Sequence, residues 1–394
     1  MTICYNIYSH FDFDGAVAAL LLKAMLADHM AKNFPSKKDE LQVQVQPVDH
    51  ASIRQSGSVS SWDLTPLSGP CAVLDFSLHP LMLSDKFYDA IDEKSHHLGL
   101  QNFWIDHHAT GAAYPFLTPE NIRARVPSRL TVLWDPASLS TPGLMRAHRK
   151  ELRLSDETIV RYEKLIDLCE IADGALFLSA SDAANFDHLA VQLQALFSTH
   201  HPLIVRNKLY CALIDQLLDI EDGHFGQFLN FDPIYSVIID YERRQHLLRF
   251  AAYQEVLQVG GEPSQVAVAD FRQRKELWQG FGRFVPYELA PECTYAIHIS
   301  PANAEGVCSI TCGRNPWKRT QEEFAFAQAA CNSGGSRRDL ATDSAEPVPV
   351  ELGKLFAGMF LGGGHQSVAG GTIREHDHKL LQDLIFVLSY SKAC

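Results

Sequence analysis

The sequence predicts an α/β fold with an N-terminal, mostly parallel sheet flanked by helices, a helical connector and a smaller C-terminal α/β domain. Strand-like and helix-like segments alternate through the first half of the chain, as they do in parallel sheets covered by helices. The segments between residues 186 and 259 are mostly helical, and strand-like segments return after them. A chain of 394 residues with 46% hydrophobic content is long enough to bury the cores of two or three domains.

The first half begins with a β-prone segment, TICYNIYS, and continues with a helical one, GAVAALLLKAMLADHMAK. A period of two residues indicates a strand in LQVQVQPV, and short apolar runs indicate buried strands in CAVLDF and NFWIDHH. A capped helix is expected in DPASLSTPGLMRAHRKEL, because Pro142 suits an early helical position and Ser140 or Thr141 can be the N-cap. A further helix is expected over residues 156–171.

Helical patterns then predict the connector, in HLAVQLQALF, NKLYCALIDQLLDI and DYERRQHLLRFAAYQEVL. Strands are expected in SQVAVADF, TYAIHIS and GVCSITCG, and a helix in VELGKLFAGMF. The stretch 331–349 is rich in Gly, Ser, Asp and Pro, which is typical of an exposed loop. We therefore expect a first domain at residues 1–185, a connector at residues 186–259 and a second domain at residues 260–394.

The charge of the chain limits its partners. The 47 acidic residues exceed the 34 basic ones and give a formal net charge of -13. This balance removes the broad attraction on which nonspecific binding to long nucleic acid depends. A small anionic ligand is still compatible with it where a metal or a local group of arginines supplies the positive field.

Cysteine content and hydropathy predict the compartment. The nine cysteines are odd in number and form no C-x-x-C pair, so we expect reduced thiols in a cytoplasmic protein. No secretory signal opens the chain, and its longest apolar stretch spans 12 residues with Lys23 inside it. We therefore expect neither secretion nor a membrane partner.

Carboxylates and imidazoles gather where the first strands are expected to end. These residues are His10, Asp12, Asp14, Asp75, Asp106, His107, His108 and, after a predicted helix, Asp173. Ligands of parallel sheets bind beyond the carboxyl ends of the strands. Five aspartates and three histidines at one sheet edge would repel one another or be desolvated at high cost unless cations neutralised them. The pattern predicts bound metal.

The types of side chain indicate which metal. Carboxylates and imidazoles without thiolates favour Mn²⁺, Mg²⁺ or Co²⁺ over structural zinc. Two such ions about 3.5 to 4 Å apart can generate a hydroxide nucleophile and bind the attacked and leaving oxygens of a phosphoryl group. A single Asp after a strand is usually a turn or cap residue, so this prediction depends on the joint occurrence of the motifs.

The ordered set of SHFDFDG, Asp75, DHHATG, Asp173 and the distant GGGHQSVAGG resembles the DHH phosphoesterase superfamily with its C-terminal DHH-associated domain. The motifs extend over residues 10–371, nearly the whole chain. Branches of this family include oligoribonucleases, RecJ-like exonucleases, exopolyphosphatases and inorganic pyrophosphatases. The resemblance implies a two-metal hydrolase with two divalent cations, Mn²⁺ being expected first, and an active site in the cleft between its domains.

The resemblance also implies a role for each residue of these motifs. One cation would be bound by His10 and Asp12, and the other by Asp14, His107 and Asp173, with Asp75 bridging the two.

Two further residues of the DHH motif would act beside the cations. Asp106 would orient a histidine that binds a cation, and His108 would face the scissile phosphate as a proton or hydrogen-bond donor. Many branches of the family have three residues between the first histidine and the first aspartate, whereas only Phe11 separates them here. Asp167 and Asp182 lie close to Asp173 and are alternatives to it.

The C-terminal region supplies candidates for binding the substrate. A glycine-rich loop can bring backbone N–H groups close to an anion, and its residues are Gly362, Gly363, Gly364 and His365. The alternative for this segment is a helix C-cap followed by a tight turn. In CGRNPWKRT, Arg314 is the preferred phosphate ligand and Trp317 can stack on a base, although such a turn is often only surface.

These observations together predict a metal-dependent phosphoesterase acting on a small phosphorylated substrate, most of all a short oligonucleotide or a nucleotide phosphoester. The alternatives are an exopolyphosphatase or pyrophosphatase-like hydrolase and a noncatalytic nucleotide-binding protein. No long nucleic acid partner is expected. The natural substrate, a homodimeric state and the role of residues 331–349 are left open by the sequence.

Overall fold

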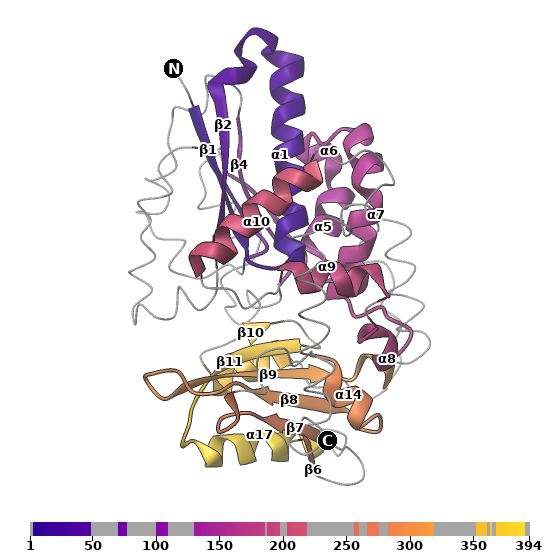
Figure 1. Ribbon diagram of the computed structural model, residues 1–394, viewed down its shortest axis with the longest axis vertical. Coiled ribbons are helices and arrows are strands. Elements are labelled where there is room, and N and C mark those ends of the chain that lie inside the picture. Colours follow the sequence, from indigo (N-terminus) through magenta and orange to yellow (C-terminus); the bar gives the residue numbers. More distant parts are fainter. Residues whose placement is uncertain are drawn as a thin grey trace. The chain divides into compact units, whose positions relative to one another are not determined.

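The computed structural model describes residues 3–48, 70–76, 100–108, 130–185, 187–197, 203–218, 256–259, 266–275, 283–318, 352–360, 363–364 and 368–390. The chain forms two compact units, each with its own sheet (Figure 1). The first unit comprises Met1–Gly174, Leu193–Tyr235 and Ala329–Arg337, and the second comprises Ala175–Gln192, Ser236–Gln328 and Arg338–Cys394.

The sheet of the first unit has five strands in the order β2-β1-β3-β4-β5, and all its neighbouring strands are parallel. Its strands are β1 (Ile3–His10), β2 (Leu41–Val48), β3 (Cys71–Leu74), β4 (Asn102–Asp106) and β5 (Leu130–Trp134). The predicted parallel sheet is confirmed. The chain first adds β2 on one side of β1 and then continues on the other side with β3. The carboxyl ends of β1 and β3 are therefore a topological switch point, where open α/β sheets bind ligands.

The helices of the first unit pack around α1. The described helices here are α1 (Phe13–Asn33), η1 (Pro35–Glu40), α5 (Thr141–Ala147), α6 (Arg149–Leu152), α7 (Asp156–Asp173), the second half of α9 (Leu189–Phe197) and α10 (Leu203–Leu218). Helix α1 contacts β1, α5, α7 and α10 (Figure 1). Contacts on several sides explain why most residues of its first half are apolar and buried, instead of forming a one-sided apolar stripe.

The expected connector is arranged differently. Helix α10 packs against α1 and the edge strand β2, so it belongs to the first unit. Val256–Val259, which we expected at the end of a helical connector, form strand β6 and pair with β7 (Val266–Asp270) of the second sheet. Most of the helical pattern before β6 lies outside the described residues.

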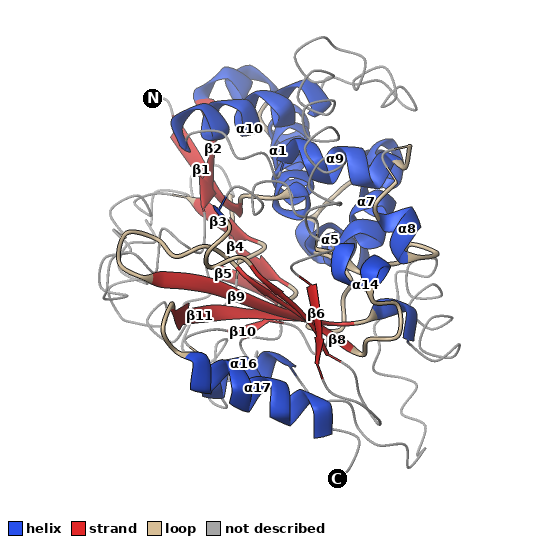
Figure 2. Cartoon of the chain, turned by 60° about the horizontal axis from the view of Figure 1, so that its bottom comes forward, coloured by secondary structure: helices blue, strands red, loops and turns tan. Residues whose placement is uncertain are grey.

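The second sheet has six strands in the order β10-β11-β9-β8-β7-β6, antiparallel except for the pair β7 and β8. Its remaining strands are β8 (Tyr295–Ile299), β9 (Val307–Arg314), β10 (Gly363–Gly364) and β11 (Val368–Arg374). The helices of this unit are α8 (Ala180–Ala183), α14 (Val285–Leu289), η7 (Pro316–Lys318), α16 (Leu352–Met359) and α17 (His378–Tyr390). Helices α16 and α17 cover one face of the sheet and bury its core there (Figure 2).

Several described elements were not predicted, among them β5, α14, β11 and α17, and the expected loop at residues 331–349 lies outside the described residues. Among the helices that the structure describes, none combines the length and the apolar character needed to cross a membrane.

Candidate metal centre

The predicted metal-binding and catalytic residues of the first unit come together at the carboxyl ends of β1, β3 and β4. These residues form three sets. Within each set, every residue offers one ligand atom, and these atoms all lie within 4.8 Å of one another. The sets are His10, Asp12 and Asp75, then Asp14, His107 and Asp173, and finally Asp75, His107 and His108. We call His10 and Asp12 the outer pair, and Asp14, His107 and Asp173 the inner set. Asp75 lies between them.

The outer pair is built by the turn from β1 into α1. The Oδ1 atom of Asp12 caps α1 by accepting the N–H of Gly15 at 2.8 Å, and its Oδ2 atom lies 2.7 Å from Nδ1 of His10. A side chain at Gly15 would collide with the backbone carbonyl of His10, so the glycine allows this close turn. The cap therefore fixes the direction of a carboxylate that also faces His10.

Asp75 follows β3 in a left-handed backbone conformation, with φ of 56°. Aspartate tolerates this conformation better than most residues, and such positions often occur at functional sites. Its buried carboxylate faces both sides of the centre. Oδ2 lies 3.6 Å from Nδ1 of His10, and Oδ1 lies 3.3 Å from Nε2 of His107.

His107 is directed into the inner set by the loop before α5. Its Nδ1 atom lies 3.3 Å from the carbonyl oxygen of Ser138, which places a donating proton on Nδ1. The opposite ring nitrogen, Nε2, then faces three carboxylates, at 3.3 Å from Asp14, 3.3 Å from Asp75 and 3.5 Å from Asp173. A nitrogen lone pair surrounded by carboxylates requires a proton or a cation between them.

The ring of His108 is held by a carboxylate, whereas the ring of His107 is held by a backbone carbonyl. Nδ1 of His108 lies 2.7 Å from Oδ1 of the fully buried Asp106, while the indole N–H of Trp134 donates to the His108 carbonyl at 2.8 Å. Asp106 therefore orients His108.

Asp173 is the last residue of α7, and its two alternatives are engaged elsewhere. Asp167 accepts a hydrogen bond from Arg146 at 2.7 Å. Asp182 belongs to the second unit, where it accepts the backbone N–H of Leu178. Of the three, the described structure brings Asp173 to His107.

Burial and neighbouring charges shift the pKa values of this cluster. Burial lowers the pKa of His107, but contacts with Asp14 and Asp75 outweigh it, and the net pKa lies well above the usual value. The pKa of His10 is raised in the same way, against burial, by Asp12 and Asp75. Burial and the charge of Asp75 raise the pKa of Asp14. Burial also acts to raise the pKa of Asp75, but the neighbouring His10 and His107 lower it well below the usual value.

The cluster suits divalent cations. Oδ1 of Asp14 and Oδ2 of Asp75 are buried and have no hydrogen-bond partner among the described residues. Buried carboxylate oxygens without partners are costly, and a hard cation is the ligand that removes this cost. The outer pair with Asp75 and the inner set are separate groups of oxygen and nitrogen donors, so the residues fit two cations.

The site also includes residues that sequence reasoning missed. Ser138 accepts a hydrogen bond from His107, and Thr141 donates hydrogen bonds to Asp14 and Asp75. Tyr210 donates from its hydroxyl to the His10 carbonyl at 2.8 Å. No local pattern in the sequence indicates these four contacts, because each joins distant parts of the chain.

The predicted substrate-binding residues lie in the second unit. Gly363 and Gly364 form β10 and pair with Gly370 and Ala369, so they are strand residues and not part of an open loop. Gly362 and His365 lie outside the described residues. Arg314 is the last residue of β9 and is partly exposed.

Trp317 packs within the second unit. Its indole N–H donates to the Phe177 carbonyl at 2.8 Å, and its ring packs edge to face against Phe284 and Tyr287. These contacts hold the indole in the short turn after β9.

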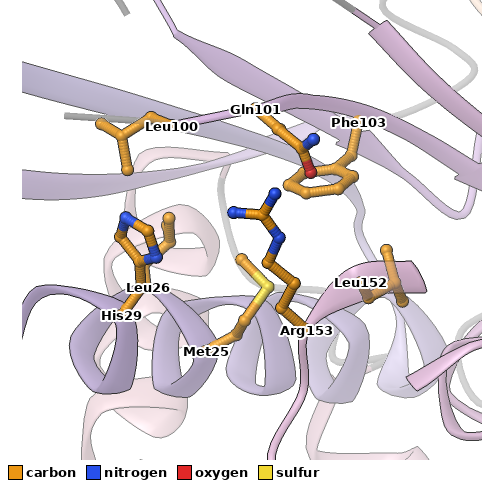
Figure 3. Close-up of a pocket in the computed structure, with 8 residues that line it drawn as sticks. All are labelled: Met25, Leu26, His29, Leu100, Gln101, Phe103, Leu152 and Arg153. Atoms are coloured by element: carbon orange, nitrogen blue, oxygen red, sulfur yellow. The ribbon is translucent and has the colours of Figure 1, made fainter. Parts of the chain in front are cut away.

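A pocket of the first unit, about 300 Å³ including the open solvent at its mouth, lies away from this centre. Its lining residues are Met25, Leu26, His29, Leu100, Gln101, Phe103, Leu152 and Arg153. Figure 3 shows the Arg153 guanidinium between Gln101 and Met25. The pocket borders the beginning of β4, whereas Asp106 ends that strand, and none of its lining residues carries a carboxylate. It is therefore separate from the candidate metal centre.

Comparisons with known proteins support the fold. No family model matches the chain, and no curated protein matches its sequence. Among solved structures, the pGpG-specific phosphodiesterase PggH from Vibrio cholerae is similar, with 15% identity and a TM-score of 0.54 over 98% of this chain and 99% of that chain. The DHH domain of a protein from a family of ribosomal proteins is similar too, with 11% identity and a TM-score of 0.55 over 98% of this chain and 86% of that chain. At such identities, these likenesses establish the architecture.

Proposed function

Because this chain has the fold of DHH-domain proteins, we propose that it is a metal-dependent phosphoesterase with two divalent cations. The observation that carries the proposal is the buried Asp75, whose two oxygens face His10 on one side and His107 on the other. This arrangement provides two adjacent donor groups with one shared carboxylate. Fold alone does not determine function, so the proposal depends on these side chains.

The roles of the residues follow from their contacts. The outer pair and the inner set would each hold one cation, and bound cations supply Lewis-acid stabilisation for a phosphoryl group. Asp106 holds the Nδ1 side of His108, so Nε2 of His108 is the ring nitrogen that would donate a hydrogen bond or a proton to the leaving oxygen. Hydrolysis would break the bond between phosphorus and that oxygen, with water adding to phosphorus.

A short, linear oligonucleotide is the substrate class that we propose first. The similar protein from Vibrio cholerae is named as specific for pGpG and aligns with nearly the full length of both chains. The net charge of -13 also favours a short substrate over a long strand. Arg314 and the residues around β10 remain candidates for contacts with its phosphates.

Mn²⁺-dependent hydrolysis by the purified protein tests this proposal. The panel holds a linear dinucleotide, a longer single strand, adenosine 3',5'-bisphosphate, a cyclic dinucleotide, pyrophosphate and polyphosphate. The key variant is Asp75→Asn, because asparagine accepts the left-handed backbone of Asp75 but lacks its charge. Asp156→Asn is the matched control, since Asp156 is exposed at the start of α7 and outside the centre.

We expect fast turnover of the dinucleotide, loss of at least about 10³-fold in Asp75→Asn, and no change in Asp156→Asn. Activity confined to pyrophosphate and polyphosphate would favour an inorganic phosphatase. Bound metal without hydrolysis of any compound would contradict the phosphoesterase proposal.

A further inference from the structure

Thr141, the first residue of α5, is fully buried and contacts two carboxylates of the centre. Its backbone N–H donates to Oδ2 of Asp14 at 2.9 Å, and its hydroxyl donates to Oδ1 of Asp75 at 3.0 Å. We infer that Thr141 is a positioning residue that holds Asp14 and Asp75 in register for cation binding. The inference rests on the metal centre of the proposed function and extends it to a residue outside the ligand motifs.

The start of α5 makes these donors available. The first N–H groups of a helix have no partner within the helix. Here Ser140 is the N-cap, and its hydroxyl accepts the N–H of Gly143 at 3.0 Å, while Pro142 has no N–H to place. Within the first turn of α5, the N–H of Thr141 is therefore the donor that points to the metal centre.

Two donors on one residue matter because the two carboxylates come from different parts of the chain. Asp14 belongs to α1, and Asp75 follows β3. Both are buried and carry like charge when ionised, so they repel each other unless other groups hold them. The same oxygens that Thr141 contacts, Oδ2 of Asp14 and Oδ1 of Asp75, face Nε2 of His107 at 3.3 Å. Thr141 thus fixes which oxygens face the histidine.

The surrounding helices fix Thr141 in turn. Arg146 of α5 bonds to Asp167 at 2.7 Å and to the buried Glu170 at 2.8 Å, both on α7. A side chain at Gly143 would collide with the Glu170 carboxylate, so glycine lets α5 approach α7 closely. The loop before α5 also orients His107 through the Ser138 carbonyl. Residues 138–141 therefore support three residues of the centre.

The test compares Thr141→Val with Thr141→Ser. Valine keeps the shape and the backbone N–H but removes the hydroxyl, whereas serine retains it. Thr158→Val is the matched control, because Thr158 is also a buried residue in the first turn of a helix, with a hydroxyl that donates to Asp28 at 2.7 Å. Mn²⁺ affinity and stoichiometry are measured by calorimetry on the full chain. The Mn²⁺ paramagnetic resonance spectrum reports the coordination directly, and circular dichroism checks folding.

We expect Thr141→Val to weaken Mn²⁺ binding by about 10- to 100-fold and to alter the resonance spectrum. Thr141→Ser should restore both, and Thr158→Val should leave both unchanged. Wild-type Mn²⁺ affinity in Thr141→Val overturns the inference. Equal losses of Mn²⁺ affinity in the serine and valine variants also overturn it. If the valine variant fails to fold, the serine variant still tests the inference, because weakened Mn²⁺ binding in a folded serine variant overturns it.

Metal binding separates this inference from the proposed function. If wild-type protein binds Mn²⁺ and hydrolyses nothing, the phosphoesterase proposal fails, while weakened binding in Thr141→Val still supports the positioning role. If wild-type protein binds no divalent cation, both are wrong.

Discussion

The outer pair and the inner set use the same chemical groups but are built in different ways. His10 and Asp12 are close neighbours in one turn, and their side chains are 21% and 33% exposed. Asp14 and His107 are 4% and 1% exposed, and they come from α1 and from the residue after β4. The outer pair is thus locally built and accessible to water, whereas most of the inner set is buried and held by distant residues. This contrast predicts unequal cation affinities.

The largest expected effect is a difference in Mn²⁺ affinity between the variants His107→Ala and His10→Ala. His107→Ala removes a donor from a buried site that water cannot easily refill, so we expect Mn²⁺ affinity at the inner set to fall by more than about 100-fold. His10→Ala opens a position that water can occupy, and we expect a loss of about 10-fold at the outer pair.

Calorimetric titration with Mn²⁺ measures both losses, and each variant should retain one class of site. Equal losses in the two variants would show that exposure does not distinguish the outer pair from the inner set.

The second prediction is a pH dependence that the two groups share. The raised pKa values of His10 and His107 mean that protonated histidines stabilise the fold without a cation. This stability is fully present below about pH 6.5, the unfolded value, and is lost as pH rises through the higher folded pKa values. The raised pKa of Asp14 acts in the same direction, because ionisation at high pH places a charge in the buried cluster. The lowered pKa of Asp75 gives stability that is lost only under acidic conditions, as pH falls below about 3.8.

Thermal unfolding between pH 6 and pH 9 tests this response, with chelator in one series and Mn²⁺ in the other. The melting temperature of the chelated protein should fall as pH rises, and Mn²⁺ should remove much of that fall because cations replace the protons. A melting temperature that rises with pH in the chelated series would contradict the protonation of both histidines.

The smallest expected effect concerns the support of the outer pair. Tyr210 is buried, bonds to the His10 carbonyl at 2.8 Å and to the Ser9 hydroxyl at 3.0 Å, and packs on Phe11. Tyr210→Phe should lower the free energy of unfolding by about 1 to 3 kcal/mol. It should also weaken Mn²⁺ binding at the outer pair by a few-fold, with the inner set unaffected.

Tyr162→Phe is the matched control, since Tyr162 is also buried and its hydroxyl donates to a backbone carbonyl, that of Leu218, at 3.1 Å. Denaturant unfolding and Mn²⁺ titration should give similar stability losses for both variants but a metal effect for Tyr210→Phe alone. If Tyr162→Phe weakened Mn²⁺ binding by the same factor, the effect of Tyr210→Phe would come from a general loss of stability and not from its contact with His10.

Local sequence patterns predicted the parts of the molecule that depend on neighbouring residues. The ends of β1, β3 and β4 follow from short apolar runs, and Ser140 is the N-cap of α5, one of the two residues that its pattern allowed. The left-handed conformation of Asp75 has no such signal, because aspartate after a strand is compatible with several turns.

The contacts that complete the centre depend on tertiary structure. The pattern around Thr141 indicates a helix start but not which carboxylates the start of α5 meets. In the sequence, Tyr210 fits the apolar pattern of an ordinary helix and shows no further signal. Its hydroxyl reaches His10 only because α10 packs on α1. Gly363 and Gly364 suggested a loop, since glycine is typical of turns, yet pairing with β11 makes them a strand.

The position of Asp173 at the end of α7 has a consequence for how the first unit holds together. A cation bound by Asp14, His107 and Asp173 would join α1, the end of β4 and the last turn of α7. Such a link acts as a reversible cross-link between segments far apart in the chain, and closing long loops restricts the unfolded chain. Loss of the cations would then lower the stability of the first unit as well as its activity, because the unit would lose the cross-link between its first helix, the end of β4 and α7.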